Sequence, residues 1–222
     1  MSPGHRSRAD PPIRPPLTRE RIAATALSLI DEVGVDGCSM RLLGSRLGVE
    51  AMALYHHFPG KGDLLEAVMD ELAAEWDLPA RGTQPPLGRL RHLVRSYRAT
   101  ALRHPRAFVL LAARRFQTER SLALSERILE ALADLGLDAA ESARWFRLIG
   151  GFASGFGMAD AASLERIDAP TPLGMERGSA IAPYPHLRAV APHLRVDKLD
   201  AVFEFGLEVL FDALAARLIG RP

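Results

Sequence analysis

The stretch SMRLLGSRLGVEAMALYHHF (residues 39–58) has helical character, yet it places two glycines, Gly44 and Gly48, four residues apart. A glycine inside a helix costs about 0.5–1 kcal/mol relative to alanine, so a glycine that persists there usually serves a packing or turning need. The pair therefore predicts a close approach or a tight turn at this point.

The residues around the two glycines predict two short helices. Ser39 is suited to cap the first, residues 40–47, and Gly48 is suited to end it in the left-handed conformation. A second helix follows over about residues 50–57, and Gly44 would let its backbone pack closely on the first. Two short helices joined by a glycine-containing turn form a helix-turn-helix, whose second helix lies in the DNA major groove.

An αα-hairpin within an all-helical core is the alternative to a DNA-binding motif. Val49 and Leu54 would fill the small core between the two helices in either case. The second helix is about two turns long and has few large apolar residues. It therefore has little apolar surface to bury in a core, and its polarity favours the DNA-binding interpretation.

Helices are also predicted on both sides of this motif. Thr18 is a plausible N-cap for the segment TRERIAATALSLIDEVG, Glu20 lies in its first turn and Gly34 closes its end. A further helix begins after PGKGD. Its inner face carries five apolar residues: Leu64, Leu65, Val68, Met69 and Leu72.

The composition is that of a globular chain. Its 222 residues are 48% hydrophobic and 25% charged, with a net charge of +1. No apolar run approaches the ~18 residues needed to span a bilayer, and the N-terminus MSPGHRSRADPPIRPPL is basic and proline-rich without an apolar core. We therefore expect no signal peptide, no membrane partner and a cytoplasmic location. The single cysteine, Cys38, excludes an intrachain disulfide and a CxxC motif.

The segment LTRERIAATALSLIDEVGVDGCSMRLLGSRLGVEAMALYHHFPGKGDLLEAVMDEL (residues 17–72) resembles the N-terminal DNA-binding domain of tetracycline-repressor (TetR) family regulators. The resemblance rests on G-x-x-G-x-S, R-x-L-x-x-x-L-G-V, L-Y-x-H-F and K-x-x-L-L. At Gly44 the family more often has alanine, which is equally small. The segments LGLDAAESARWFRLIGGFASGFGMAD and FEFGLEVLFDALAARL resemble the C-terminal half of the tetracycline-repressor branch, less specifically.

The resemblance implies an all-α fold in which an N-terminal three-helix DNA-binding domain precedes a larger helical domain for ligand binding and dimerisation. We expect a flexible basic arm over residues 1–16, the DNA-binding domain over residues 17–62 and the second domain over residues 63–222. The arm carries arginines suited to a partner that bears phosphates.

The expected DNA contacts are assigned position by position. Arg41 can reach a guanine edge or a phosphate, and Glu50 can accept a hydrogen bond from cytosine or simply stabilise a helix N-terminus. The resemblance implies that Tyr55 and Lys61 contact the sugar-phosphate backbone of DNA. Lys61 opens a helix, and the free N–H groups at a helix start also favour a phosphate. The full expected set is Thr18, Ser39, Arg41, Glu50, Ala51, Met52, Ala53, Tyr55, His56, His57 and Lys61.

The second half is helical by pattern, with predicted helices over residues 86–103, 125–137, 138–166 and 196–218 and a short apolar segment, RAFVLLAARRF. An irregular stretch, IDAPTPLGMERGSAIAPYP, is either a loop near a ligand entrance or plain linker. The resemblance implies that the glycine-rich helix and the last helix pair with their twofold mates. We expect the stripe of Leu207, Leu210, Phe211 and Leu214 to face that partner.

The expected pocket suits a largely apolar, drug-sized molecule without a metal ion. Family members that bind metal-chelated tetracycline use a histidine that aligns within residues 108–115, where this chain has none, and an acidic residue that aligns with Ala159. Adjacent His56 and His57 point about 100° apart on a helix and would not share a metal. We expect no cofactor, and pocket walls drawn from Tyr97, His104, Phe108, Leu111, Phe116, Trp145, Phe152 and Phe156.

A helical enzyme is the alternative class, with His104, His186 or His193 beside Asp160 or Asp168. The chain contains no G-x-S-x-G, P-loop, H-E-x-x-H or G-x-G-x-x-G motif. We therefore expect a ligand-responsive regulator, a repressor rather than an enzyme, that binds a palindromic double-stranded DNA operator as a homodimer and is released by a small molecule.

Overall fold

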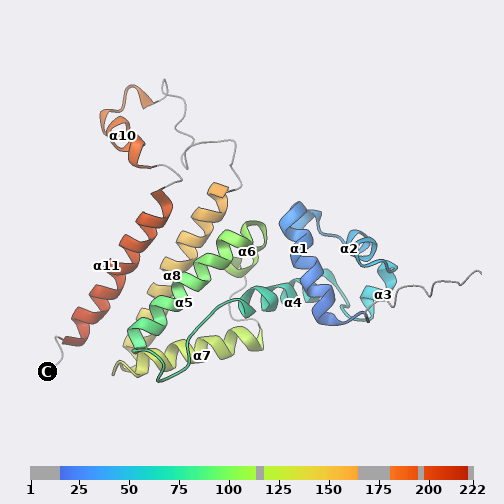
Figure 1. The fold of residues 1–222 in the computed structure, drawn as a ribbon, viewed down its shortest axis with the longest axis horizontal. Helices are drawn as coiled ribbons and strands as arrows, with labels where there is room; N and C mark the ends of the chain where they lie inside the picture. Colours follow the sequence, from blue (N-terminus) through green and yellow to red (C-terminus); the bar gives the residue numbers. More distant parts are fainter. Residues whose placement is uncertain (1–15, 114–117, 165–180, 195–197, 220–222) are drawn as a thin grey trace, which may run out of the picture.

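The structure, a computed structural model, describes residues 16–113, 118–164, 181–194 and 198–219. Within these ranges the chain is helical, as predicted, and Figure 1 shows two parts of unequal size. The helices α1 to α3 form one end, α4 runs from that end toward a larger body, and α10 projects from the body. The bounds are α1 Arg19–Gly37, α2 Met40–Leu47, α3 Ala51–Tyr55, α4 Lys61–Ala74, α5 Pro86–Arg103, α6 Pro105–Ala113, α7 Glu119–Ala133, α8 Ala139–Leu164, α10 Pro185–Val190, the 3₁₀ helix η1 Ala191–His193 and α11 Leu199–Ile219.

Helix α1 begins and breaks at the predicted residues. The Thr18 side chain caps it by accepting a hydrogen bond from the Arg21 N–H at 3.2 Å. Gly34 lies at φ 78° and ψ 168°, which breaks the helical geometry before a last short turn ends at Gly37. Its inward face, including Ile22, Ala26 and Ile30, is fully buried.

The turn between α2 and α3 explains both glycines of the opening stretch. Gly48 adopts the left-handed conformation at φ 71° and ψ 33° and ends α2, as predicted. At Gly44, an added Cβ would lie 2.8 Å from the Val49 carbonyl oxygen and 3.2 Å from the Ala51 nitrogen. Both neighbours are backbone atoms. Alanine is therefore not equivalent to glycine at this position, contrary to our expectation, because α3 starts against the α2 backbone.

One apolar core joins the small part to the body. It contains buried residues of α1 to α4 together with Ala101 of α5 and Ala107, Phe108, Leu110 and Leu111 of α6. A second core joins α5, α7, α8 and α11, with Phe203, Leu207 and Phe211 from α11. Packing therefore continues across residue 62, and α4 with α6 forms the joint between the two parts.

Helix α7 begins at Glu119, six residues earlier than the 125–137 segment that the pattern predicted. Thr118 caps it by accepting from the Ser121 N–H, while the Ser121 hydroxyl accepts from the Thr118 N–H, at 3.2 Å each. Serine in place of the usual Glu or Gln hides this capping box in the sequence. Most of the irregular stretch lies in residues 165–180, outside the described ranges. No described helix is long and apolar enough to cross a membrane.

Candidate DNA-binding surface and ligand cavity

The short helix α3 presents small and exposed side chains at the end of the molecule. Met52 is 69% exposed, and Glu50, which precedes the helix as its N-cap, makes no side-chain capping bond. Leu54 is buried and holds α3 to the small core. Arg41 on α2 is exposed beside this helix, and Ala51 and Ala53 are partly buried. The helix can therefore approach another surface without loss of its own packing.

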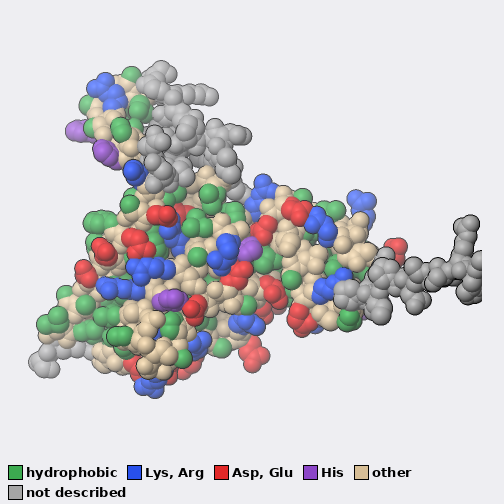
Figure 2. Space-filling model, viewed as in Figure 1, with side chains coloured by type: hydrophobic (Ala, Val, Ile, Leu, Met, Phe, Trp, Pro, Cys, Tyr) green, Lys and Arg blue, Asp and Glu red, His purple; other side chains and the backbone are tan. Residues whose placement is uncertain are grey.

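A second group of side chains surrounds α3. Tyr55 and His56 are exposed, and Ser39 caps α2 by accepting from the Leu42 N–H at 3.2 Å. Lys61 opens α4, and its Nζ donates to the Val35 carbonyl oxygen at 2.8 Å. The Thr18 and Ser39 caps and Lys61 lie at helix starts, where backbone N–H groups favour anions, while Tyr55 and His56 lie at the end of α3. Figure 2 shows this end of the molecule with Lys and Arg side chains among acidic ones.

Arg19 is a residue that the sequence analysis did not assign to the site. Its guanidinium donates to the His57 carbonyl oxygen and lies 4.2 Å from the centroid of the Phe58 ring. It thereby fixes the turn that carries His56 and His57. No periodicity signals this role, because Arg19 meets the turn only in three dimensions.

A cavity of about 440 Å³ lies in the larger part of the molecule. Helices α4 to α8 contribute to its walls, which are mostly apolar, with a few hydroxyl groups and one arginine. No carboxylate is among the described lining residues. They are Met69, Ala73, Trp76, Leu93, Val94, Tyr97, Leu111, Thr118, Ser121, Leu124, Ser125, Ile128, Phe146, Arg147, Ile149, Gly150, Gly151, Ala153 and Ser154.

Two of the expected pocket residues, Tyr97 and Leu111, line this cavity. The Tyr97 hydroxyl lies 3.0 Å from the Ser154 Oγ, and its ring packs 4.8 Å from that of Trp76, between centroids. Trp76 was not expected in the pocket. It lies two residues beyond the end of α4, and no sequence motif marks it.

The other expected pocket residues lie elsewhere. Phe108 is fully buried behind the wall, so close to Gly157 that a Cβ there would lie 2.6 Å from its ring. Phe152 and Phe156 pack against Phe203 of α11, with ring centroids 5.7 Å apart in each pair. Trp145 packs on the same second core, and Phe116 lies outside the described residues. Apolar spacing alone does not separate a cavity wall from the core behind it.

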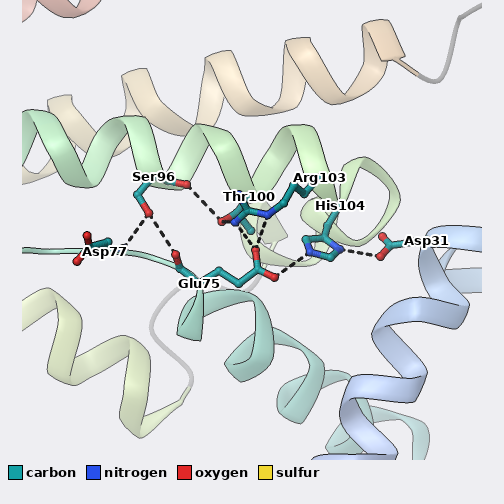
Figure 3. Close-up of polar contacts among 7 residues, drawn as sticks. All are labelled: Asp31, Glu75, Asp77, Ser96, Thr100, Arg103 and His104. Carbon is teal, nitrogen blue, oxygen red and sulfur yellow. Dashed lines mark hydrogen bonds and ion pairs between the residues drawn. The ribbon is translucent and has the colours of Figure 1, made fainter.

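His104 does not line the cavity but joins the two parts of the molecule. It is the C-cap of α5, and its Nδ1 lies 2.7 Å from Asp31 Oδ2 on α1. Its Nε2 lies 2.9 Å from Glu75 Oε1 at the end of α4. Figure 3 shows the imidazole between the two carboxylates, with Arg103 on the far oxygen of Glu75 at 2.5 Å.

The two carboxylates of this group differ in their titration. Burial raises the pKa of Asp31 and outweighs the opposing hydrogen bond from His104. Burial also acts to raise the pKa of Glu75, but Arg103 and His104 together outweigh it, so that the pKa of Glu75 is lowered.

A buried ion pair ties α11 to the body. Arg98 Nε donates to Asp160 Oδ2 at 2.5 Å, its terminal nitrogen contacts Asp200 at 2.7 Å, and its guanidinium lies over the Phe203 ring at 4.5 Å. Asp160 is fully buried, as expected of a paired structural charge rather than a catalytic one.

The outward face of α11 differs from the face expected to meet a partner. Leu207, Phe211 and Leu214 are fully buried within the protomer, so this part of the expected stripe faces the core and the expectation was wrong. The exposed apolar residues of α11 include Phe205, at 67%, and Val209, at 55%. Figure 2 shows hydrophobic side chains at the surface near the end of α11, at lower left. The adjacent face of α8 is open too, with an exposed Leu148 and no atom within 4 Å of a Cβ at Gly151 or Gly155.

The described residues contain no group of three or more His, Cys, Asp or Glu side chains that could hold a metal ion. The site is thus an exposed short helix after a glycine turn, joined by α4 to a body with an apolar cavity. These features define the class of helix-turn-helix regulators with a separate ligand-binding part.

Family comparisons agree with this class. Residues 22–68 match the family of bacterial regulatory proteins, tetR family, and residues 78–218 match the tetracyclin repressor-like C-terminal domain. The chain belongs to the TetR family of transcriptional regulators, which are DNA-binding proteins and not enzymes.

Individual relatives show the same likeness. The tetracycline repressor protein class A from transposon 1721 of Escherichia coli is 33% identical over 202 residues, which cover 88% of this chain and 89% of that protein. An HTH-type transcriptional regulator of Saccharopolyspora erythraea is 33% identical over 128 residues, 58% of this chain and 54% of that one. The match spans about half the length of two of these relatives: 54% of the Saccharopolyspora erythraea regulator and 53% of the repressor DrrR1 of Streptomyces coeruleorubidus.

Solved structures share the whole fold. A possible TetR family transcriptional regulator from Streptomyces coelicolor A3(2) superposes with a TM-score of 0.76 at 31% identity, covering 90% of this chain and 99% of that one. The Streptomyces coelicolor protein ActR in complex with actinorhodin gives a TM-score of 0.74 at 26% identity, covering 93% of this chain and 100% of that one.

Proposed function

We propose that this chain is a ligand-responsive transcriptional repressor, which binds a palindromic operator as a homodimer and is released when a small molecule occupies its cavity. The observation that carries the proposal is the course of α4. Its first residue, Lys61, lies on the DNA-binding surface, while Met69 and Ala73 near its other end line the cavity. A ligand that moves this helix would move the DNA-binding end with it.

On the DNA side, the proposal assigns base contacts to α3 and phosphate contacts to the groups around it. Arg41, Glu50, Ala51, Met52 and Ala53 would face base edges. The groups proposed for the sugar-phosphate backbone are Thr18, Ser39, Tyr55, His56, His57 and Lys61. Arg19 would act indirectly, because it holds the turn that carries the two histidines.

The homodimer is proposed to form through the exposed faces of α8 and α11. Phe205 and Val209 would be covered by the partner, and the open space at Gly151 and Gly155 would admit its helix. Apolar side chains lie on both sides of α11, since one face already packs in the protomer core. A helix that is apolar around its circumference is typical of burial on two sides. Two recognition helices would then read half-sites about one DNA turn, ~34 Å, apart.

The effector is proposed to be an aromatic or otherwise apolar molecule with a few polar groups. The cavity offers hydroxyls from Thr118, Ser121 and Ser125 and the Tyr97–Ser154 pair, and Arg147 is its only charged lining residue among those described. A neutral or anionic ligand therefore fits better than a cationic one. ActR, solved with actinorhodin, is a relative with a ligand of its own. The described lining residues include no imidazole or carboxylate, so we propose binding without a metal ion.

Selection of duplexes from a random-sequence pool tests the DNA part of the proposal. We expect a palindromic consensus, with two protomers per duplex by sedimentation. Enrichment of no sequence, or of an asymmetric site bound by one protomer, would contradict the proposal. Thermal-shift screening of aromatic compounds, repeated with a magnesium chelator, tests the effector class.

A further inference from the structure

We propose that Asp31, His104 and Glu75 form a proton-carrying chain that couples occupancy of the cavity to the position of α1. The proposal rests on the proposed function, which assigns DNA binding to the part of the molecule that contains α1. It adds which residues connect the cavity to α1 and that the coupling depends on a proton. The three side chains come from α1, from the junction of α5 with α6 and from the end of α4 (Figure 3).

The chain of contacts is continuous from α1 to α4. Asp31 Oδ2 lies 2.7 Å from one nitrogen of His104, and Glu75 Oε1 lies 2.9 Å from the other. All three side chains are less than one-third exposed, at 25%, 17% and 29%. Hydrogen bonds in such a partly dehydrated place are stronger than on the open surface and more costly to leave unmade.

The geometry requires a proton. A neutral imidazole has one N–H donor and one acceptor nitrogen, whereas both nitrogens of His104 face carboxylate oxygens. Both contacts can be hydrogen bonds in two ways only. Either both imidazole nitrogens carry a proton, or the imidazole is neutral and one of the two carboxyl groups is protonated. The closed chain therefore holds one proton more than a chain of neutral histidine with two ionised carboxylates.

Every element packed around His104 contributes a charged group. Asp31 comes from α1, Glu75 from the end of α4, Arg103 from α5 and Arg106 from α6. Arg103 is paired with Glu75, and Arg106 donates to the backbone carbonyl of Glu32 on α1. Imidazole is the side-chain type whose charge ordinarily changes between about pH 5 and about pH 8, which makes His104 the member of this group that suits a proton-dependent contact.

The other end of the chain reaches the cavity through Trp76. Trp76 lines the cavity and follows Glu75 directly. The Ser96 hydroxyl donates to the Glu75 carbonyl at 3.2 Å and accepts from the Asp77 N–H at 2.8 Å, which fixes the backbone on both sides of Trp76 to α5. A molecule that packs against the Trp76 indole and holds it in place therefore also favours the position of Glu75 that closes the chain.

The sign of the coupling follows from the structure, in which the open cavity and the closed chain occur together. A cavity ligand that binds this state should bind more tightly when the chain holds its proton, and more weakly as pH rises and the proton is lost. None of the described cavity-lining side chains titrates between about pH 5 and about pH 8. A pH dependence in this range must therefore come from outside the cavity.

The test uses the naphthalene dye 1-anilinonaphthalene-8-sulfonate, whose sulfonate stays ionised throughout. In a Trp145→Phe background Trp76, which lines the cavity, is the single tryptophan, so its quenching follows dye bound within reach of the cavity. We expect the affinity to be about fivefold lower at about pH 8 than at about pH 5.5. His104→Gln and Glu75→Gln should each reduce this difference to less than about 1.3-fold.

His92→Gln is the matched control, because His92 lies on the same helix and meets one carboxylate, Asp77, at 2.7 Å, outside the chain. It should keep the pH dependence of the background. A background affinity that is flat or rises with pH would overturn the proposal, as would an unchanged dependence in His104→Gln. Glu75→Gln serves as the second variant if His104→Gln does not fold.

The α1 end is tested with Asp31→Asn. This variant should lose the pH dependence as well, and the dye should change the affinity for a selected duplex less in the variant than in the background. An unaltered pH dependence in Asp31→Asn would overturn the link to α1. If no duplex is retained by any form of the protein, the proposed function fails, and the pH dependence of dye binding still decides the existence of the chain.

Discussion

Gly44→Ala is the substitution that most sharply tests the geometry of the DNA-binding end. In isolation, alanine should stabilise helix α2 by about 0.5–1 kcal/mol. In this structure its Cβ would lie 2.8 Å from the Val49 carbonyl oxygen. An extra methyl group forced into a packed core costs typically about 1–3 kcal/mol, here by moving α3 away from α2. The net expectation is a loss of about 1 kcal/mol in the free energy of unfolding, within a range of about 0–2.5 kcal/mol.

Thermal unfolding at a fixed protein concentration measures this loss. For a chain of this size a loss of about 1 kcal/mol corresponds to a fall of about 2–4 °C in Tm. Gly62→Ala in α4 is the control, because no atom lies within 4 Å of the added Cβ and its Tm should stay level or rise. The affinity for a selected duplex should fall in Gly44→Ala alone. A Gly44→Ala protein that is at least as stable as the wild type and binds DNA equally well would show that the Val49 carbonyl does not exclude a Cβ at residue 44.

Three further expectations follow from the DNA-binding surface, the exposed helices and the cavity. Lys61→Ala should weaken binding to specific and non-specific DNA alike, and the slope of log affinity against log salt concentration should fall by about one counterion. Equal slopes for the wild type and the variant would show that Lys61 does not contact a phosphate. Phe205→Glu should give folded monomers by sedimentation, whereas Leu214→Ala, at a fully buried position, should cost about 2–5 kcal/mol of protomer stability instead. Stabilisation by an aromatic cavity ligand should survive magnesium chelation, and its loss on chelation would contradict the metal-free pocket.

The helix-turn-helix was predictable because its signals are local. A serine cap, a left-handed glycine and a small residue at the close approach each act within a few residues of one another. Ser39, Gly44 and Gly48 do in the structure what the sequence indicated, apart from the exclusion of alanine at Gly44. That exclusion depends on the distance to one carbonyl oxygen, which no residue pattern records.

The cavity was predicted only in part because its walls and the core behind them have the same composition. Phe108 and Leu111 are neighbours on one helix, yet only Leu111 reaches the cavity. Trp76 enters it from a segment with no periodic pattern, and His104 leaves it for two carboxylates that are distant in sequence. On α11, apolar residues all around the helix conceal which face meets the protomer core.

Release of DNA by a cavity ligand is tested by the affinity for a selected palindromic duplex, measured with and without a saturating cavity ligand found by thermal shift. Fluorescence anisotropy of a labelled duplex gives both values at one salt concentration. We predict that two protomers bind each duplex and that the ligand raises Kd by about tenfold or more. An unchanged Kd, while the ligand is shown to occupy the cavity of the DNA-bound protein, would contradict release of DNA by a cavity ligand.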